Sequence, residues 1–353
     1  MAIEASIAGA SDTRTDHGGN FNLLRVAAGM AVVYGNGLIL TGAPASAFWG
    51  APFSRFALDL LFAISGFTVA GSWLRRPRLL AFVAGRLRRI MPGLALCVLV
   101  SAAIIGPLAT HLPLRGYALN GMTLDYLSNI AFVEKLWLPG VFQGQQWVGT
   151  VNPMLWTLLP GLLFCLALPP IFLLPPRWRV WAIVAGAIAL SLPLVKGTHL
   201  YHPRHIDILV ELPFSAVGAA LRHIQDRVKQ LWRADVAMLL FAANWVSATW
   251  LGEWNLILEW VSLPYLVACF GRMDLPLLGG LGRWGNPGYG LYLYAFPIQQ
   301  SVVALWPACP HPIMLCGALS LAAGYVSWHL VERPALDWTW HGSSLRRLSY
   351  PAP

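Results

Sequence analysis

The segment FNLLRVAAGMAVVYGNGLILTG, residues 21–42, decides how this chain folds. About 20 mostly apolar residues suffice to cross a bilayer as one helix, and this helix has to carry two polar side chains, Arg25 and Asn36. At about 100° per residue, eleven steps make three turns plus about 20°, so both side chains share a face about 16 Å apart along the axis. Either Arg25 extends to the cytoplasmic interface and Asn36 binds a neighbouring helix, or both belong to a functional site.

The composition assigns the whole chain to the membrane class. Of its 353 residues 57% are hydrophobic and 11% are charged, whereas a soluble domain carries about 25% charged residues. The net charge of +9 does not indicate a nucleic-acid partner, because the basic residues interrupt apolar runs instead of covering a wet surface. The expected partner of the surface is therefore the lipid bilayer.

The fold class that we expect is an all-α, polytopic membrane protein with about ten transmembrane helices. The spans are expected at residues 21–42, 56–73, 90–111, 154–174, 178–195, 206–221, 234–250, 254–270, 288–307 and 312–332.

Lys and Arg residues set the expected orientation. With the N-terminus inside, 18 of them fall in inner segments and five in outer segments, so the positive-inside rule places both termini in the cytoplasm. We therefore expect a cytoplasmic tail at 1–20, one transmembrane domain at 21–336 and a second cytoplasmic tail at 337–353. The first 20 residues lack the pattern of a cleaved signal peptide, and we expect the arginine-rich segment 74–89 to be a cytoplasmic loop.

Two further polar clusters are candidate sites. In LDLLFAISGFTVAGSWLRR, residues 58–76, Asp59 is a carboxylate at the outer end of a span, and Ser65 and Gly66 let a helix or a ligand approach the backbone closely. Arg86 and Arg89 stand at i and i+3 on one helix face. Two guanidinium groups so placed can bind a phosphate, although positive-inside arginines are expected at this position in any case.

Cysteine and histidine give no clear metal site. The five cysteines form no CxxC pair, and only Cys309 and Cys316 flank a short loop in which they could pair. His199, His202 and His205 lie within seven residues and could bind a metal. An interfacial loop is the preferred interpretation, so no metal is expected.

Taken together, these segments resemble the acyltransferase-3 family of integral membrane acyltransferases. The resemblance rests on six ordered motifs: F-x-x-L-R ending at Arg25, D-x-x-F-x-x-S-G-F from Asp59, R-x-x-R-x-x-P from Arg86, V-N-x-x-L-W-T-L from Val151, Y-G-L-Y-L-Y from Tyr289 and W-x-x-V-E-R-P-A-L from Trp328. It implies an enzyme that moves an acyl group, most often acetyl from acetyl-CoA, to a hydroxyl of a glycan or a small glycoside.

The resemblance also implies roles for the polar residues. Arg25, Arg86, Arg89 and Ser65 would bind the acyl-CoA donor on the cytoplasmic side. The acceptor would contact Asn152, Trp156, Tyr292 and Glu332, although Glu332 could equally form an ion pair with an inner-surface arginine. The expected location is the inner (plasma) membrane of a bacterium.

One position departs from the family pattern. Family members have a His eleven residues after the first Arg, where it acts as general base or acyl relay, and this chain has Asn36. An amide has no pKa near neutrality and cannot serve as a base, which leaves Asp59 as another candidate. Gly161 and Ala295 also replace polar residues that are frequent in the family. One altered position favours an introduced change and three favour natural divergence.

Two non-catalytic interpretations stay open. The chain could be a carrier or flippase that moves an acyl or glycan group without covalent chemistry, which Asn36 and Ala295 favour. It could also be a silent scaffold subunit of a polysaccharide-export system, for which the sequence offers no interaction module.

Overall fold

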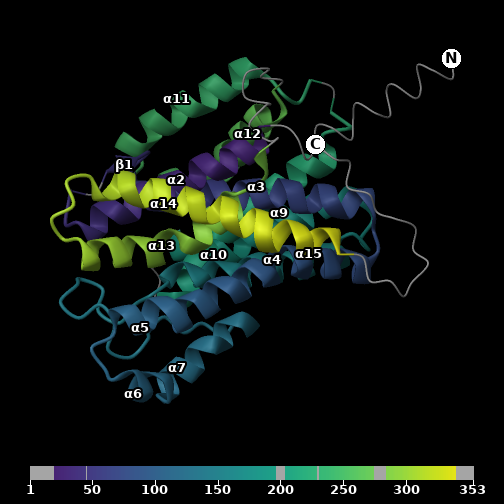
Figure 1. The fold of residues 1–353 in the computed structure, drawn as a ribbon. Helices are drawn as coiled ribbons and strands as arrows, with labels where there is room; N and C mark the ends of the chain where they lie inside the picture. Colours follow the sequence, from purple (N-terminus) through teal and green to yellow (C-terminus); the bar gives the residue numbers. More distant parts are fainter. Residues whose placement is uncertain (1–19, 45, 196–202, 229, 274–283, 339–353) are drawn as a thin grey trace. The chain divides into compact units, whose positions relative to one another are not determined.

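A computed structural model describes residues 20–44, 46–195, 203–228, 230–273 and 284–338 of the chain, and these are mostly helical (Figure 1). Residues 1–19 and 339–353, which make up nearly all of the two expected tails, lie outside the described residues, as do His199, His202 and the side chain of His205. The long helices are α2 Phe21–Leu40, α3 Phe53–Arg75, α4 Leu79–Val100, α8 Leu158–Ile171, α9 Pro176–Val195, α10 Pro203–Ile224, α11 Ala234–Trp250, α12 Asn255–Arg272, α13 Gly288–Leu305 and α14 Pro312–Ser327.

Short elements join these helices. They are the hairpin β1 Ala47–Phe48 and β2 Ala51–Pro52, the π-turns η1 Ser101–Ile105 and η6 Trp328–Glu332, the short helices α5 Gly106–Ala109, α6 Leu114–Ala118, α7 Gly121–Tyr126 and α15 Arg333–Asp337, and the 3-10 turns η2 Leu127–Ala131, η3 Pro153–Thr157 and η4 Gly252–Trp254. The hairpin is a small departure from the all-α expectation.

Each expected span overlaps one of the long helices, although several of the helices extend beyond the expected bounds. Among the residues that the structure describes, five helical segments are long and apolar enough to cross a membrane, namely Phe21–Leu40, Phe53–Arg75, Leu79–Ala109, Pro153–Ile171 and Pro312–Asp337. The ranges of α9 to α13 are helical as well, but their crossing of the membrane stays a prediction. The same holds for the orientation of the termini.

Helix α4 begins earlier than the sequence pattern predicted. It starts at Leu79, just after Pro77, so residues 79–89 are helical and the expected loop at 74–89 is wrong over most of its length. The physical reason is that the segment between Leu79 and Pro92 is rich in Leu, Ala and Arg, which are good helix formers, with Gly85 as its one weak position. Arg86 and Arg89 lie inside this helix, so their predicted i, i+3 placement on one helix face is confirmed.

The chain forms two compact units, and each combines three segments that are separated in the sequence. The first unit comprises residues 1–28, 47–83 and 160–282, and the second comprises 29–46, 84–159 and 283–353. Helices α2 and α4 each contribute residues to both units.

In the first unit, α3 and α10 cross at very close range. A Cβ atom added to Gly66 would lie 2.0 Å from the Ser215 carbonyl oxygen, and one added to Gly218 would lie 2.7 Å from that of Ala63. Ser215 Oγ also donates a hydrogen bond to Phe62 O at 3.0 Å. Of the two roles considered for Gly66, the structure thus supports the approach of another helix.

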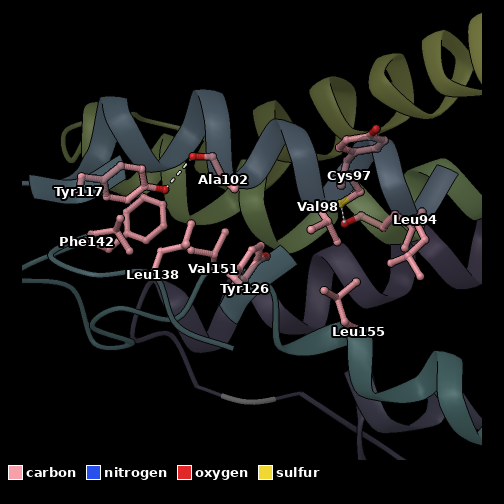
Figure 2. Packing of buried hydrophobic residues seen from close by; sticks show 13 residues of the cluster. Leu94, Cys97, Val98, Ala102, Tyr117, Tyr126, Leu138, Phe142, Val151 and Leu155 are labelled. Atoms are coloured by element: carbon pink, nitrogen blue, oxygen red, sulfur yellow. Dashed lines mark hydrogen bonds between the residues drawn. The ribbon is translucent and has the colours of Figure 1, made fainter. Parts of the chain in front are cut away.

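In the second unit, the connection between α5 and η3 folds over α4 around its own apolar core. Figure 2 shows Tyr117, Leu138, Phe142 and Val151 gathered beside the helix, all of them buried. The Tyr117 hydroxyl donates to Ala102 O at 2.7 Å, a carbonyl of the π-turn η1. Burial raises the pKa of Tyr117 to about 12, so this hydroxyl keeps its proton and remains a donor at physiological pH.

The crossing of α3 and α10 leads to a first prediction. Gly66→Ala should lower the apparent melting temperature of the purified protein, because overpacking a tight contact costs about 1–3 kcal/mol and here the clash is with backbone. The control is Gly85→Ala, because a Cβ at Gly85 meets nothing within 4 Å and alanine favours a helix. If both variants melt alike in detergent, the close approach does not hold the two helices together.

Candidate active site

Asn36 lies in the second unit and is buried. It is 6% exposed, and its Nδ2 atom approaches the Met154 sulfur at 3.7 Å, a weak contact. Met154 belongs to η3, which starts directly after Asn152. The Asn36 side chain is therefore set against this turn.

Asn152 shapes the turn that Asn36 contacts. It is fully buried, and its Oδ1 accepts a hydrogen bond from the Met154 backbone N–H at 3.2 Å, which makes it the N-cap of η3. Its Nδ2 donates to Leu293 O of α13 at 2.9 Å and approaches Cys97 Sγ of α4 at 3.6 Å. A single amide thus ties η3 to two helices of the second unit.

Tyr292 completes this cluster. Its hydroxyl donates to Met154 O at 3.2 Å and shares a hydrogen bond of 2.8 Å with Thr157 Oγ1. Three sequence-predicted residues, Asn36, Asn152 and Tyr292, therefore meet around Met154. Trp156 lies on the same turn and is half-buried.

A second cluster of this unit surrounds Arg89. Its Nη1 lies 3.2 Å from Oε2 of Glu332, which is fully buried, and the guanidinium carbon lies 5.0 Å from the Trp328 ring centroid and 5.9 Å from that of Tyr289. Of the two roles considered for Glu332, the described contacts show the ion pair with an arginine. Arg86 lies one turn earlier on α4 and is partly buried.

The remaining candidates lie in the first unit. Arg25 donates to Asn22 Oδ1 at 3.1 Å and to Thr68 Oγ1 at 3.2 Å, which joins α2 to α3. Ser65 lies on α3 one turn before Thr68 and is half-buried. Its carbonyl oxygen accepts a hydrogen bond from the Thr68 hydroxyl at 3.3 Å.

Asp59 of the first unit is part of an ion cluster. Arg55 Nε lies 3.1 Å from Asp59 Oδ1 and 3.0 Å from Glu211 Oε1, and both carboxylates are 1% exposed. On α12 the Asn255 amide donates to Glu259, also buried, and to Trp49 O of the hairpin.

Comparison with known proteins identifies the family of this chain. The family model described as "Acyltransferase domain" matches residues 19–287, which is more than half of the chain. The chain belongs to the acyltransferase-3 family. No solved structure gives a significant match.

Two curated relatives of this acyltransferase-family chain match over most of their length. An "O-acetyl transferase" of Shigella phage Sf6 is 24% identical, with 89% of this chain and 94% of the relative aligned. "Nodulation protein 10" of Rhizobium leguminosarum bv. viciae is 26% identical, with 91% and 94% aligned.

Gly161 and Ala295, which the resemblance predicts to be altered positions, have different surroundings. A Cβ at Gly161 would meet nothing within 4 Å, whereas Ala295 is fully buried. A Cβ atom thus has room at the first position, and a side chain larger than alanine would have to displace neighbours at the second. The roles of Asn36, Asp59 and the other site candidates in transfer stay predictions.

Sequence reasoning missed some of the buried polar residues. Glu211, Glu259 and Asn255 were not chosen as site candidates, although each falls in or beside an expected apolar span, and an ionisable residue in a span is a functional candidate by default. That rule would have found both glutamates.

In the described part of the chain, no three metal-ligating side chains lie together, and Cys309 and Cys316 both have free thiols.

The Arg55 cluster leads to a second prediction. Arg55→Met should destabilise the protein by about 2–3 kcal/mol, because it removes the cation that two buried carboxylates contact. The loss is limited because the Arg55 side chain is 30% exposed. Adding Asp59→Asn and Glu211→Gln should recover most of the loss in apparent melting temperature. The control, Arg233→Met, removes an exposed partner of Asp235 and should change little. A triple variant no more stable than Arg55→Met would contradict the charge explanation.

Proposed function

We propose that this chain is a membrane O-acyltransferase that moves an acyl group, acetyl in the simplest case, from acyl-CoA to a hydroxyl of a glycan or small glycoside. The observation that carries the proposal is the family match over residues 19–287. The name of the Sf6 relative, "O-acetyl transferase", supports the reaction class.

The donor would bind at the Arg86 and Arg89 end of α4. The phosphates of coenzyme A need cations in fixed positions, and a guanidinium binds a phosphate through paired, charge-assisted hydrogen bonds. Arg89 contacts Glu332 and two aromatic rings. Arg86 lies three residues earlier on the same face of α4. Because 18 Lys and Arg lie in the segments expected to be inner, we place this end at the cytoplasmic surface of a bacterial inner membrane.

The transfer step needs a proton acceptor. The acceptor hydroxyl oxygen attacks the thioester carbonyl carbon, the C–S bond breaks, and the hydroxyl proton ends on the coenzyme A sulfur. A histidine suits this relay because its pKa near 6.5 lets it take and return a proton. Asn36 can orient a hydroxyl but cannot take its proton, so we propose slow transfer by this sequence.

A carrier or flippase is the second candidate. It is favoured by the amide at position 36 and by the fully buried alanine at position 295, because neither group can move a proton. In that case donor binding would persist without any transfer, even after position 36 is restored.

The donor assignment leads to a third prediction. Arg86→Ala combined with Arg89→Ala should weaken coenzyme A binding about tenfold or more, because a lost charge-assisted contact costs about 1.5–3 kcal/mol. Lysine replacements should recover only part of the affinity, since a point charge cannot reproduce the guanidinium fork. Calorimetry on the full chain in detergent measures the effect.

Arg88→Ala is the matched control. Arg88 lies on the same helix and is exposed, so the Arg88→Ala variant removes one positive charge from the same segment without touching the proposed phosphate contacts. If the double variant and the control bind coenzyme A like the unaltered chain, the arginines act only as topology signals.

The altered position leads to a fourth prediction. Asn36→His should raise the rate of acyl transfer by about 10²–10⁴, because general-base catalysis contributes about that factor while coenzyme A binding should not change. The assay follows acetyl-CoA turnover in proteoliposomes with a glycan acceptor.

Two results would contradict this account of position 36. A fast rate with Asn36 that the histidine does not alter would show that another group, such as Asp59, is the base. A histidine variant that binds coenzyme A but transfers to none of the acceptors, even after Ala295→His, would favour the carrier.

A further inference from the structure

The π-turn η6 joins two side chains that a regular helix would separate. Ser327 and Glu332 are five residues apart, and in an α-helix this spacing turns them about 140° away from each other. In the wider turn of Trp328–Glu332, Ser327 Oγ donates to Glu332 Oε1 at 2.9 Å. Single π-turns inside helices are rare and frequently mark functional sites.

The neighbouring helix is adapted to this turn. A Cβ added to Gly290 of α13 would lie 2.9 Å from Ser327 Cβ, 3.0 Å from Gly324 Cα and 3.2 Å from Glu332 Oε1. A side chain at Gly290 would therefore push on both Ser327 and Glu332. The absence of a side chain at Gly290 thus leaves the space that Ser327 and Glu332 occupy.

The same turn places a ring against the arginine. The Trp328 ring centroid lies 5.0 Å from the Arg89 guanidinium carbon, within the range of a cation–π contact. Gly285, whose φ is +114°, gives Trp328 its space, because a Cβ there would lie 2.4 Å from Trp328 Cδ1. One turn thus supplies both the anion and the ring that hold Arg89.

We propose that Ser327 and Glu332 are positioning residues for the acyl donor, acting through Arg89. The Glu332 carboxylate, oriented by the Ser327 hydroxyl, holds the guanidinium so that its remaining N–H groups face a donor phosphate. A guanidinium has five N–H groups, and the Arg89 side chain is still 23% exposed. This proposal rests on the proposed function, because it assumes that Arg89 binds the donor.

A double-mutant cycle tests the proposal with coenzyme A as the probe and the full chain in detergent. Glu332→Gln should weaken binding about five- to tenfold, and Ser327→Ala about two- to fourfold, when Arg89 is present. In an Arg89→Ala background each should change the affinity less than about twofold, because the residue through which both act is absent. Asp337→Asn, which breaks the exposed pair with Arg333 on the neighbouring turn, is the control and should bind like the unaltered chain.

The cycle separates this proposal from the proposed function. If Arg89→Ala binds coenzyme A normally, the donor assignment of Arg89 fails and this proposal with it. If Arg89→Ala weakens binding but Glu332→Gln or Ser327→Ala weakens it equally in both backgrounds, the donor assignment stands and the positioning role is overturned. Should Glu332→Gln fail to fold, the Ser327→Ala pair of measurements decides in the same way.

Discussion

The constraint on which this structure depends is that polar side chains within apolar helices must find their partners inside the protein. Water does not compensate a buried charge there, and each unsatisfied group is costly. Arg55 contacts two buried carboxylates, Arg89 contacts one, and Asn152 caps a turn while it binds a carbonyl of α13. The contacts of Arg55 with Glu211, of Arg89 with Glu332 and of Asn152 with Leu293 each join two helices or turns that are distant in sequence, so these polar residues help to set which elements are neighbours.

The close helix crossings follow from the same constraint. An ion pair or an amide bond between two helices needs their backbones to approach, and small residues permit this approach. Gly66 and Gly218 do so where α3 meets α10, and Gly290 and Gly324 where α13 meets α14. The π-turn at Glu332 is a further adaptation, because it turns a carboxylate toward Arg89 that a regular helix would direct elsewhere.

Much of the fold could be predicted from the sequence, because apolar runs of helical length are a strong local signal. The helical placement of Arg86 and Arg89 on one face was predicted, but the start of α4 was set too late because the arginine-rich stretch 74–89 was assigned to a loop, although arginine is a good helix former. The meeting of Asn36, Asn152 and Tyr292 at Met154 depends on three-dimensional packing, and spacing along the chain contains no information about it. The ion pair of Glu332 with Arg89 could be named only as one of two alternatives, because a local sequence does not show a π-turn.

The central claim is that Arg86 and Arg89 of α4 bind the phosphates of an acyl donor, with Arg89 held by its contact with Glu332. The most direct measurement is a cryo-electron microscopy map of the full chain in lipid nanodiscs with coenzyme A. We predict phosphate density within hydrogen-bond distance of both guanidinium groups, with the contact between Arg89 and Glu332 retained. Coenzyme A density elsewhere on the chain, or an Arg89 that leaves Glu332 when the ligand binds, would contradict the account.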